Sequence, residues 1–103
     1  MNDAVARWQK LVENQPHNEL ARFSLGKAWF DLGQFAAARE HFQIALARKP
    51  DWMVAQILIG KCEQALGDNG AAKPAFERAL QLAIAQHHEG PQAEMEELLR
   101  ELD

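Results

Sequence analysis

The chain has 103 residues, of which 48% are hydrophobic, and a formal net charge of -4 at pH 7. This length fits one domain, and so high an apolar content excludes an intrinsically disordered chain. The acidic balance, without any cluster of basic residues, argues against a nucleic-acid-binding protein, because phosphate binding needs concentrated positive charge.

The single cysteine, Cys62, excludes an internal disulfide and slightly favours the cytoplasm. The N-terminal sequence MNDAVARWQKLV lacks the apolar run of a signal peptide. No segment approaches the ~20 apolar residues of a membrane span. We therefore expect a cytoplasmic protein without a membrane span.

The first helix is predicted over residues 3–14, where apolar residues recur at helical spacing, and Pro16 ends it. Asn18 is a suitable N-cap for a second helix that reaches about Leu32. Gly33 is the expected break after that helix.

A third helix is predicted over residues 35–48, because its apolar residues form a single stripe. The fourth is predicted over residues 52–66, with Asp51 as its cap and the sequence LGDNG as the turn after it.

The fifth helix is predicted over about residues 70–86, and Ile84, where the repeat pattern expects Pro, lets it run on towards His88. Gly90 and Pro91 then separate it from a last helix over residues 92–102, since proline suits the first position of a helix. This last helix has one apolar stripe and a surface rich in glutamate. We interpret it as a C-terminal cap that keeps a stack of helices soluble.

Part of the chain repeats with a period of 34 residues. Small and large apolar residues return in the same order, which indicates two copies of one helical hairpin. The matching residues are Leu25, Gly26, Ala38, Phe42 and Ala45 in the first copy and Ile59, Gly60, Ala72, Phe76 and Ala79 in the second.

These residues resemble the tetratricopeptide repeat, whose pattern is W-x2-L-G-x2-Y, then A-x3-F, then P, over 34 residues of helix-turn-helix. In the first copy, Arg22 stands in place of the Trp and Trp29 in place of the Tyr. The second copy is looser, with Gln56, Glu63 and Ile84 in place of the Trp, Tyr and Pro.

The resemblance implies an all-α fold of about six helices, stacked as right-handed superhelical helix-turn-helix repeats in a single domain over residues 1–103. Residues 3–16 resemble the second half of an earlier copy. The expected units are a half repeat or N-terminal cap (3–16), two full repeats (18–50 and 51–86) and a C-terminal capping helix (91–102).

In the tetratricopeptide family, the first helices of the repeats line a concave surface where peptides dock. The corresponding positions here follow the spacing i, i+3, i+7 and i+10, which is one face of a helix. The resemblance thus implies a peptide-binding groove lined by Leu20, Phe23, Lys27, Phe30, Val54, Ile57, Lys61 and Gln64. An apolar groove crossed by two lysines suits a short helix or extended segment with apolar anchors and an acidic residue.

Two other interpretations of these residues are open. An apolar stripe is more often simple core, and lysines along a helix are usually only solvated.

One version of the family, the carboxylate clamp for acidic chaperone tails, does not fit. It needs Lys and Asn where this sequence has Phe23 and Lys27, and a second Asn at Leu58.

Catalytic signals are weak. His87, His88 and Glu89 are consecutive, so they cannot share one face of a helix as metal ligands do. Cys62 lies where a small buried residue is expected, which favours an inert thiol. No phosphate-binding loop, HExxH or GxSxG motif occurs. We therefore predict a protein that is not an enzyme and has no cofactor and no metal site.

The predicted function is a non-enzymatic protein-protein interaction module, an adaptor or scaffold, with an unidentified protein or peptide partner and no nucleic acid. The alternative is a self-associating structural subunit. In that case the uncovered side of the first helix would pair across a two-fold axis in a homodimer.

Overall fold

The structure is a computed structural model that describes residues 3–102, and those residues form six helices and no strand. The all-α, tetratricopeptide-like fold predicted from the sequence is confirmed. Residues 1, 2 and 103 of the predicted domain lie outside the described residues. The helices are α1 (Asp3–Asn14), α2 (Glu19–Asp31), α3 (Phe35–Arg48), α4 (Met53–Ala65), α5 (Asn69–Ala85) and α6 (Glu89–Leu102).

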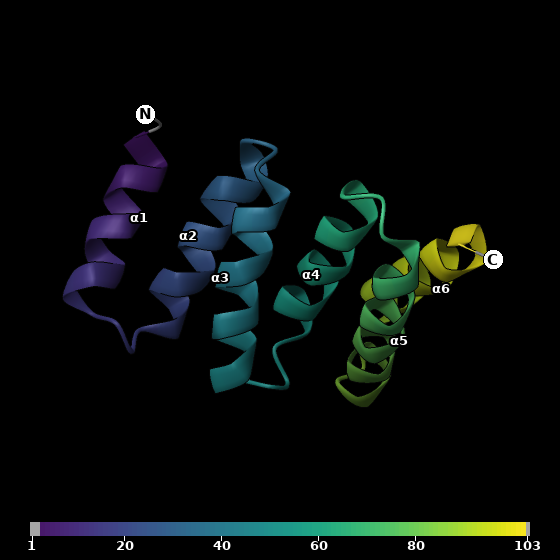
Figure 1. Ribbon diagram of the computed structural model, residues 1–103. Coiled ribbons are helices and arrows are strands. Elements are labelled where there is room, and N and C mark those ends of the chain that lie inside the picture. Colours follow the sequence, from purple (N-terminus) through teal and green to yellow (C-terminus); the bar gives the residue numbers. More distant parts are fainter. Residues whose placement is uncertain (1–2, 103) are drawn as a thin grey trace.

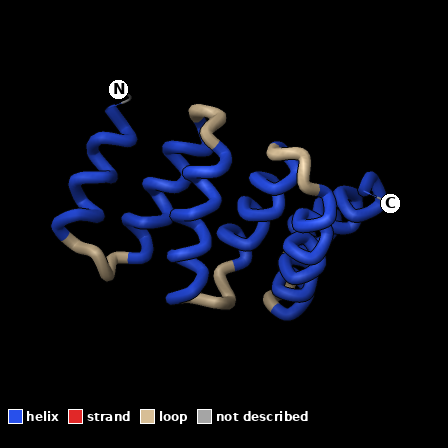
Figure 2. Tube along the Cα trace, viewed as in Figure 1, coloured by secondary structure: helices blue, strands red, loops and turns tan. Residues whose placement is uncertain are grey.

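Each helix packs against the next helix in the chain, and short loops connect them (Figures 1 and 2). The described part of the molecule measures 40 × 27 × 19 Å, and α1 and α6 lie at its opposite ends (Figure 1). Such an elongated stack is held together by contacts between neighbouring helices rather than by one central core. Between residues 3 and 102, no helix combines the length and apolar character that a bilayer crossing requires.

The core is accordingly divided along the stack into three clusters of buried apolar side chains. The first joins α1 to α2, the second lies around α3 and α4, and the third joins α4 and α5 to α6. Their largest fully buried side chains are Leu25 in the first, Phe42 and Cys62 in the second, and Phe76 and Met95 in the third.

Two glycines allow the helices of each repeat to approach closely. A Cβ atom at Gly26 would lie 2.8 Å from Cε1 of Phe42, and one at Gly60 would lie still closer to the ring of Phe76. Both phenylalanine rings are fully buried. The glycine and phenylalanine of the repeat pattern are therefore one contact, in which the ring occupies the space that a side chain on the first helix would take.

The turn inside each repeat uses a glycine in the left-handed region. Gly33 has φ 76° and Gly67 has φ 82°. After each, a backbone amide bonds to a carbonyl five residues earlier, from Gln34 to Trp29 (3.0 Å) and from Asp68 to Glu63 (2.9 Å). These bonds satisfy carbonyl groups at the helix end and stop the helix there.

Side-chain caps begin two of the helices. Asn18 Oδ1 accepts a hydrogen bond from the amide of Ala21 (3.0 Å), which confirms the predicted cap of α2. Asp68 Oδ1 does the same for Ala71 at the start of α5 (3.0 Å).

The predicted cap of α4 by Asp51 is wrong. Trp52 occupies the N-cap position, and its side chain makes no capping hydrogen bond. The carbonyl of Asp51 instead accepts a hydrogen bond from the side chain of Gln86 (2.9 Å), which ties the loop before α4 to the end of α5.

The predicted boundary between the last two helices is also wrong. Helix α5 ends at Ala85, because His87 adopts φ 58° and the amide of His88 bonds to the carbonyl of Ala83 (2.9 Å). Gly90 and Pro91 do not separate the helices but lie in the first turn of α6, where a missing proline amide leaves no hydrogen bond unmade.

Candidate peptide-binding surface

The eight residues predicted to bind a peptide, called here the candidate groove, lie on two helices. Leu20, Phe23, Lys27 and Phe30 are on α2, and Val54, Ile57, Lys61 and Gln64 are on α4. Within each helix their spacing places them on one side.

The apolar members on α2 differ in exposure. Leu20 is 64% exposed, whereas Phe23 and Phe30 are half-buried. The ring of Phe23 stacks on Trp52, with centroids 4.6 Å apart, and the rings of Phe30 and Phe35 form a T-shaped pair with centroids 5.3 Å apart. Internal packing therefore holds both rings in place, and only part of each remains available to a partner.

Lys27 is exposed, but its charge already has a partner. Its Nζ lies 2.6 Å from Oδ1 of Asp31, one turn further along α2, and 5.7 Å from the centre of the Phe30 ring. A surface ion pair of this kind stabilises by roughly 0–1 kcal/mol, so it can open readily.

On α4, the predicted residues are more covered by the fold. Val54 is 44% exposed, whereas Ile57 is 7% exposed and belongs to the core cluster that contains Met95 of α6. Lys61 Nζ lies 2.9 Å from Oε2 of Glu94, also on α6. Gln64 is half-buried. Helix α6 therefore contacts the α4 half of the candidate groove and reduces the surface that this half exposes to a partner.

The other half of the groove opens into a pocket of about 270 Å³ between α1 and α2. Phe23 and Lys27 line it, together with Trp8 of α1. Sequence reasoning assigned Trp8 to the N-terminal cap and missed it as a site residue. The signal that would have found it is its position, which is that of the repeat's Phe, a large side chain that packs towards the first helix of the next repeat.

A second pocket, of about 460 Å³, lies where α1 meets Trp29. Its lining from α1 includes Val5, Ala6 and Lys10. None of the eight groove residues lines this pocket, so it is separate from the candidate groove.

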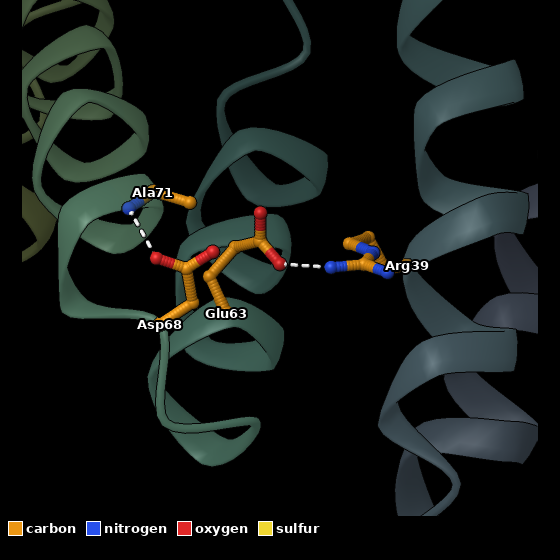
Figure 3. A network of polar contacts seen from close by, with 4 residues as sticks. All are labelled: Arg39, Glu63, Asp68 and Ala71. Carbon is orange, nitrogen blue, oxygen red and sulfur yellow. Dashed lines mark hydrogen bonds and ion pairs between the residues drawn. The ribbon is translucent and has the colours of Figure 1, made fainter.

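A network of polar contacts joins the two repeats (Figure 3). Arg39 of α3 donates to the carboxylate of Glu63 on α4, and Asp68 caps α5 beside them. Hydrogen bonding to Glu63 raises the pKa of Arg39, so the guanidinium stays charged. Glu63 occupies the position of the repeat's Tyr, and an ion pair between helices thus takes the place of an aromatic contact.

The remaining titratable groups offer little for catalysis. Burial raises the pKa of the Cys62 thiol to about 11. The pKa of His41 is lowered, first by burial and then by the charge of Arg22. Over residues 3–102, no three His, Cys, Asp or Glu side chains gather as metal ligands would.

Comparisons with known proteins agree with this architecture. The tetratricopeptide repeat profile matches residues 2–51 and 55–83. The TPR repeat-containing protein PA0015 of Pseudomonas aeruginosa is 35% identical over 95 residues, which cover 92% of this chain and 90% of that protein.

Among solved structures, protein BPP2914 from Bordetella parapertussis is 32% identical, with a TM-score of 0.86 over 99% of this chain and 89% of its own. PcrH in complex with the chaperone binding region of PopD gives a TM-score of 0.90 over 97% of this chain and 76% of its own. PcrH is 24% identical to this chain, so its likeness concerns the fold. This chain belongs to the tetratricopeptide repeat family.

Proposed function

We propose that this protein is a non-enzymatic interaction module that binds a peptide or short helix of another protein along the candidate groove. The observation that carries the proposal is a repeated pair of exposed aliphatic side chains. Leu20 and Val54 occupy the same position in successive repeats and are 64% and 44% exposed. Large apolar side chains left open in register suit a partner with apolar anchors at matching intervals.

Family membership supports this proposal, since tetratricopeptide repeat proteins are typically non-enzymatic protein-interaction modules. PcrH, which shares the fold, is known in complex with the chaperone binding region of PopD. We extend to this chain only the general expectation of a protein or peptide partner. The absence of a cofactor and the cytoplasmic location stay predictions from the sequence.

The geometry of the groove also favours binding. Phe23 is already held by stacking on Trp52 and Phe30 by a T-shaped contact with Phe35, so a partner that contacts them orders few side chains. The pocket of about 270 Å³ beside Phe23 can accept one apolar side chain. The candidate groove has only eight residues, and so small an interface suits a dissociation constant of about 1 μM or weaker.

The test is affinity capture from a native cell extract, followed by rebinding of each captured protein in purified form. The wild type is compared with a Leu20→Asp, Val54→Asp variant. Leu32→Asp, Leu66→Asp is the matched control, because these leucines are also 34 residues apart and are 43% and 44% exposed at the ends of α2 and α4. We expect the partner to be lost only with the groove variant, with helical content unchanged in all three proteins.

If the partner is lost equally with both variants, or is retained with both, groove binding is contradicted.

Self-association is the second candidate. The observation that favours it is the pocket of about 460 Å³ at α1 and Trp29, which a second copy could fill. Sedimentation across micromolar concentrations decides this point, since a persistent monomer would remove the candidate.

A further inference from the structure

We propose that the segment bound in the candidate groove is apolar at one end and basic at the other, with its lysine or arginine residues facing α6. This inference rests on the proposed function and specifies the chemistry of its partner. The proposed charge of the partner is opposite to the acidic charge expected from the two groove lysines.

Neither groove lysine is free to attract an acidic partner. Lys27 is paired with Asp31 at 2.6 Å, and Lys61 is paired with Glu94 at 2.9 Å. An acidic segment would have to displace a carboxylate from each lysine, and each displaced carboxylate would then repel that segment. The lysines that suggested an acidic ligand therefore already have carboxylate partners within the fold, which weakens their preference for an acidic segment.

Helix α6 adds a row of carboxylates beside the groove. Glu94, Glu97 and Glu101 follow the spacing i, i+3 and i+7, so they lie on one side of α6. The ion pair of Glu94 with Lys61 fixes that side towards the groove face of α4. All three glutamates are exposed. Glu97 pairs with Arg100, and within residues 3–102 the carboxylate of Glu101 makes no ion pair.

The charge of the whole molecule is concentrated at this helix. Helix α6 holds five glutamates and one arginine, a net charge of -4, which equals the net charge of the chain. The rest of the sequence contains ten basic and ten acidic residues and is balanced. At physiological salt, such a field extends about 8 Å from the surface, far enough to orient a bound segment.

The apolar end of the groove lies away from this charge. Trp8, Phe23 and Ala28 line the pocket of about 270 Å³ between α1 and α2. The molecule is 40 Å long, and an extended segment advances about 3.3 Å per residue, so about twelve residues span its whole length and fewer reach from this pocket to α6. An apolar anchor and a basic stretch can thus be occupied by one short segment.

The experiment uses two labelled synthetic peptides of about twelve residues, which is long enough to span the groove when extended. Their first halves carry the same apolar residues, and their second halves carry only lysine or only glutamate as charged residues. Binding is measured by fluorescence anisotropy at low and high salt.

We expect the lysine peptide to bind at least about tenfold more tightly than the glutamate peptide at low salt, with the difference shrinking as salt rises.

Charge-reversal variants test the role of α6. Glu97→Lys, Glu101→Lys should weaken binding of the lysine peptide by about tenfold. Glu40→Lys, Glu77→Lys is the matched control, because it changes the net charge equally at exposed glutamates on α3 and α5. The control should alter binding by less than about twofold, since these charges lie on the second helices of the repeats.

Tighter binding of the glutamate peptide, an equal effect of the control variant, or no binding of either peptide would overturn the basic-partner inference. None of these results bears on the proposed function, which the capture experiment judges separately. If Leu20→Asp, Val54→Asp bound the lysine peptide as tightly as the wild type, binding would lie outside the groove. That result would overturn this inference, and the proposed function would fall only if native partners also survived the substitution.

Discussion

Cys62 shows most clearly how the fold changes the chemistry of a single residue. Its side chain is fully buried on α4, next to the ion pair between Arg39 and Glu63. Burial disfavours the charged thiolate and raises the pKa to about 11 from an ordinary value of 9.0. A cysteine reacts as a thiolate that the reagent can reach. In this fold Cys62 is protonated and buried, so it meets neither condition.

We therefore expect Cys62 to resist labelling by a thiol reagent at pH 8 in the native protein and to react at an ordinary rate in urea. The raised pKa has a second consequence. The protonated thiol is favoured in the folded state, so its stabilising effect is present below pH 9 and is lost as the pH rises towards 11. A Cys62→Ala variant should lack this part of the alkaline decline in the free energy of unfolding, as urea titrations would measure. Rapid native labelling would contradict the buried, protonated thiol.

His87 is strained, because in the turn between α5 and α6 it holds a left-handed backbone conformation that glycine adopts at the two turns inside the repeats. A residue with a side chain pays about 1 kcal/mol or more in that conformation. We expect His87→Gly to raise the free energy of unfolding by about 0.5–1 kcal/mol, which is a few degrees in Tm for a domain of this size.

The matched control for this prediction is His88→Gly. His88 has no positive φ, so its replacement should leave stability unchanged or lower it. A gain from both substitutions, or from His88→Gly alone, would contradict strain at His87.

At the scale of helices, stability depends on how closely α4 approaches α5. A Cβ at Gly60 would collide with the ring of Phe76, which is fully buried and therefore has little room to move. Alanine favours the helix by up to about 1 kcal/mol over glycine, but overpacking costs about 1–3 kcal/mol. The collision therefore outweighs the gain in helix propensity.

We expect Gly60→Ala to lower the free energy of unfolding by about 1–2 kcal/mol in urea titrations. Gly90→Ala in α6 is the control, because a Cβ there would meet no atom within 4 Å. It should raise stability by up to about 1 kcal/mol. Should Gly60→Ala also stabilise the protein, the close approach of the two helices would be contradicted.

At the scale of the whole molecule, an elongated stack has ends that differ from its middle. Helix α1 has a neighbouring helix on one side, whereas α3 and α4 lie between neighbours on both sides. In such a stack, stability is roughly the sum of contributions from each unit and its interfaces, so the ends open more readily than the centre.

Amide hydrogen exchange should show this difference. We expect the amides of α1 to exchange at least about tenfold faster than those of α3 and α4, since local opening at an end breaks one interface instead of two. Mass spectrometry of exchanged peptides would measure it. Uniform protection along the chain would contradict the repeat-by-repeat account of stability.

The sequence by itself determined the fold. The 34-residue period, with glycine in one helix and phenylalanine in the next, predicted the hairpins, because these local spacings repeat wherever the same contact is made. It also placed Leu20 and Val54 at equivalent positions. The division into repeats and the role of the eight groove residues stay predictions.

Only the tertiary structure decided which groove residues are available and what charge they present. Ile57 is buried in the core cluster that joins α4 and α5 to Met95 of α6, and Lys61 is paired with Glu94, 33 residues further along the chain. The end of α5 likewise depended on a strained histidine that no turn pattern marks. Spacing along a chain predicts which face of a helix a residue occupies. Burial and ion pairing also depend on segments that are distant in sequence, and these come close only when the helices stack.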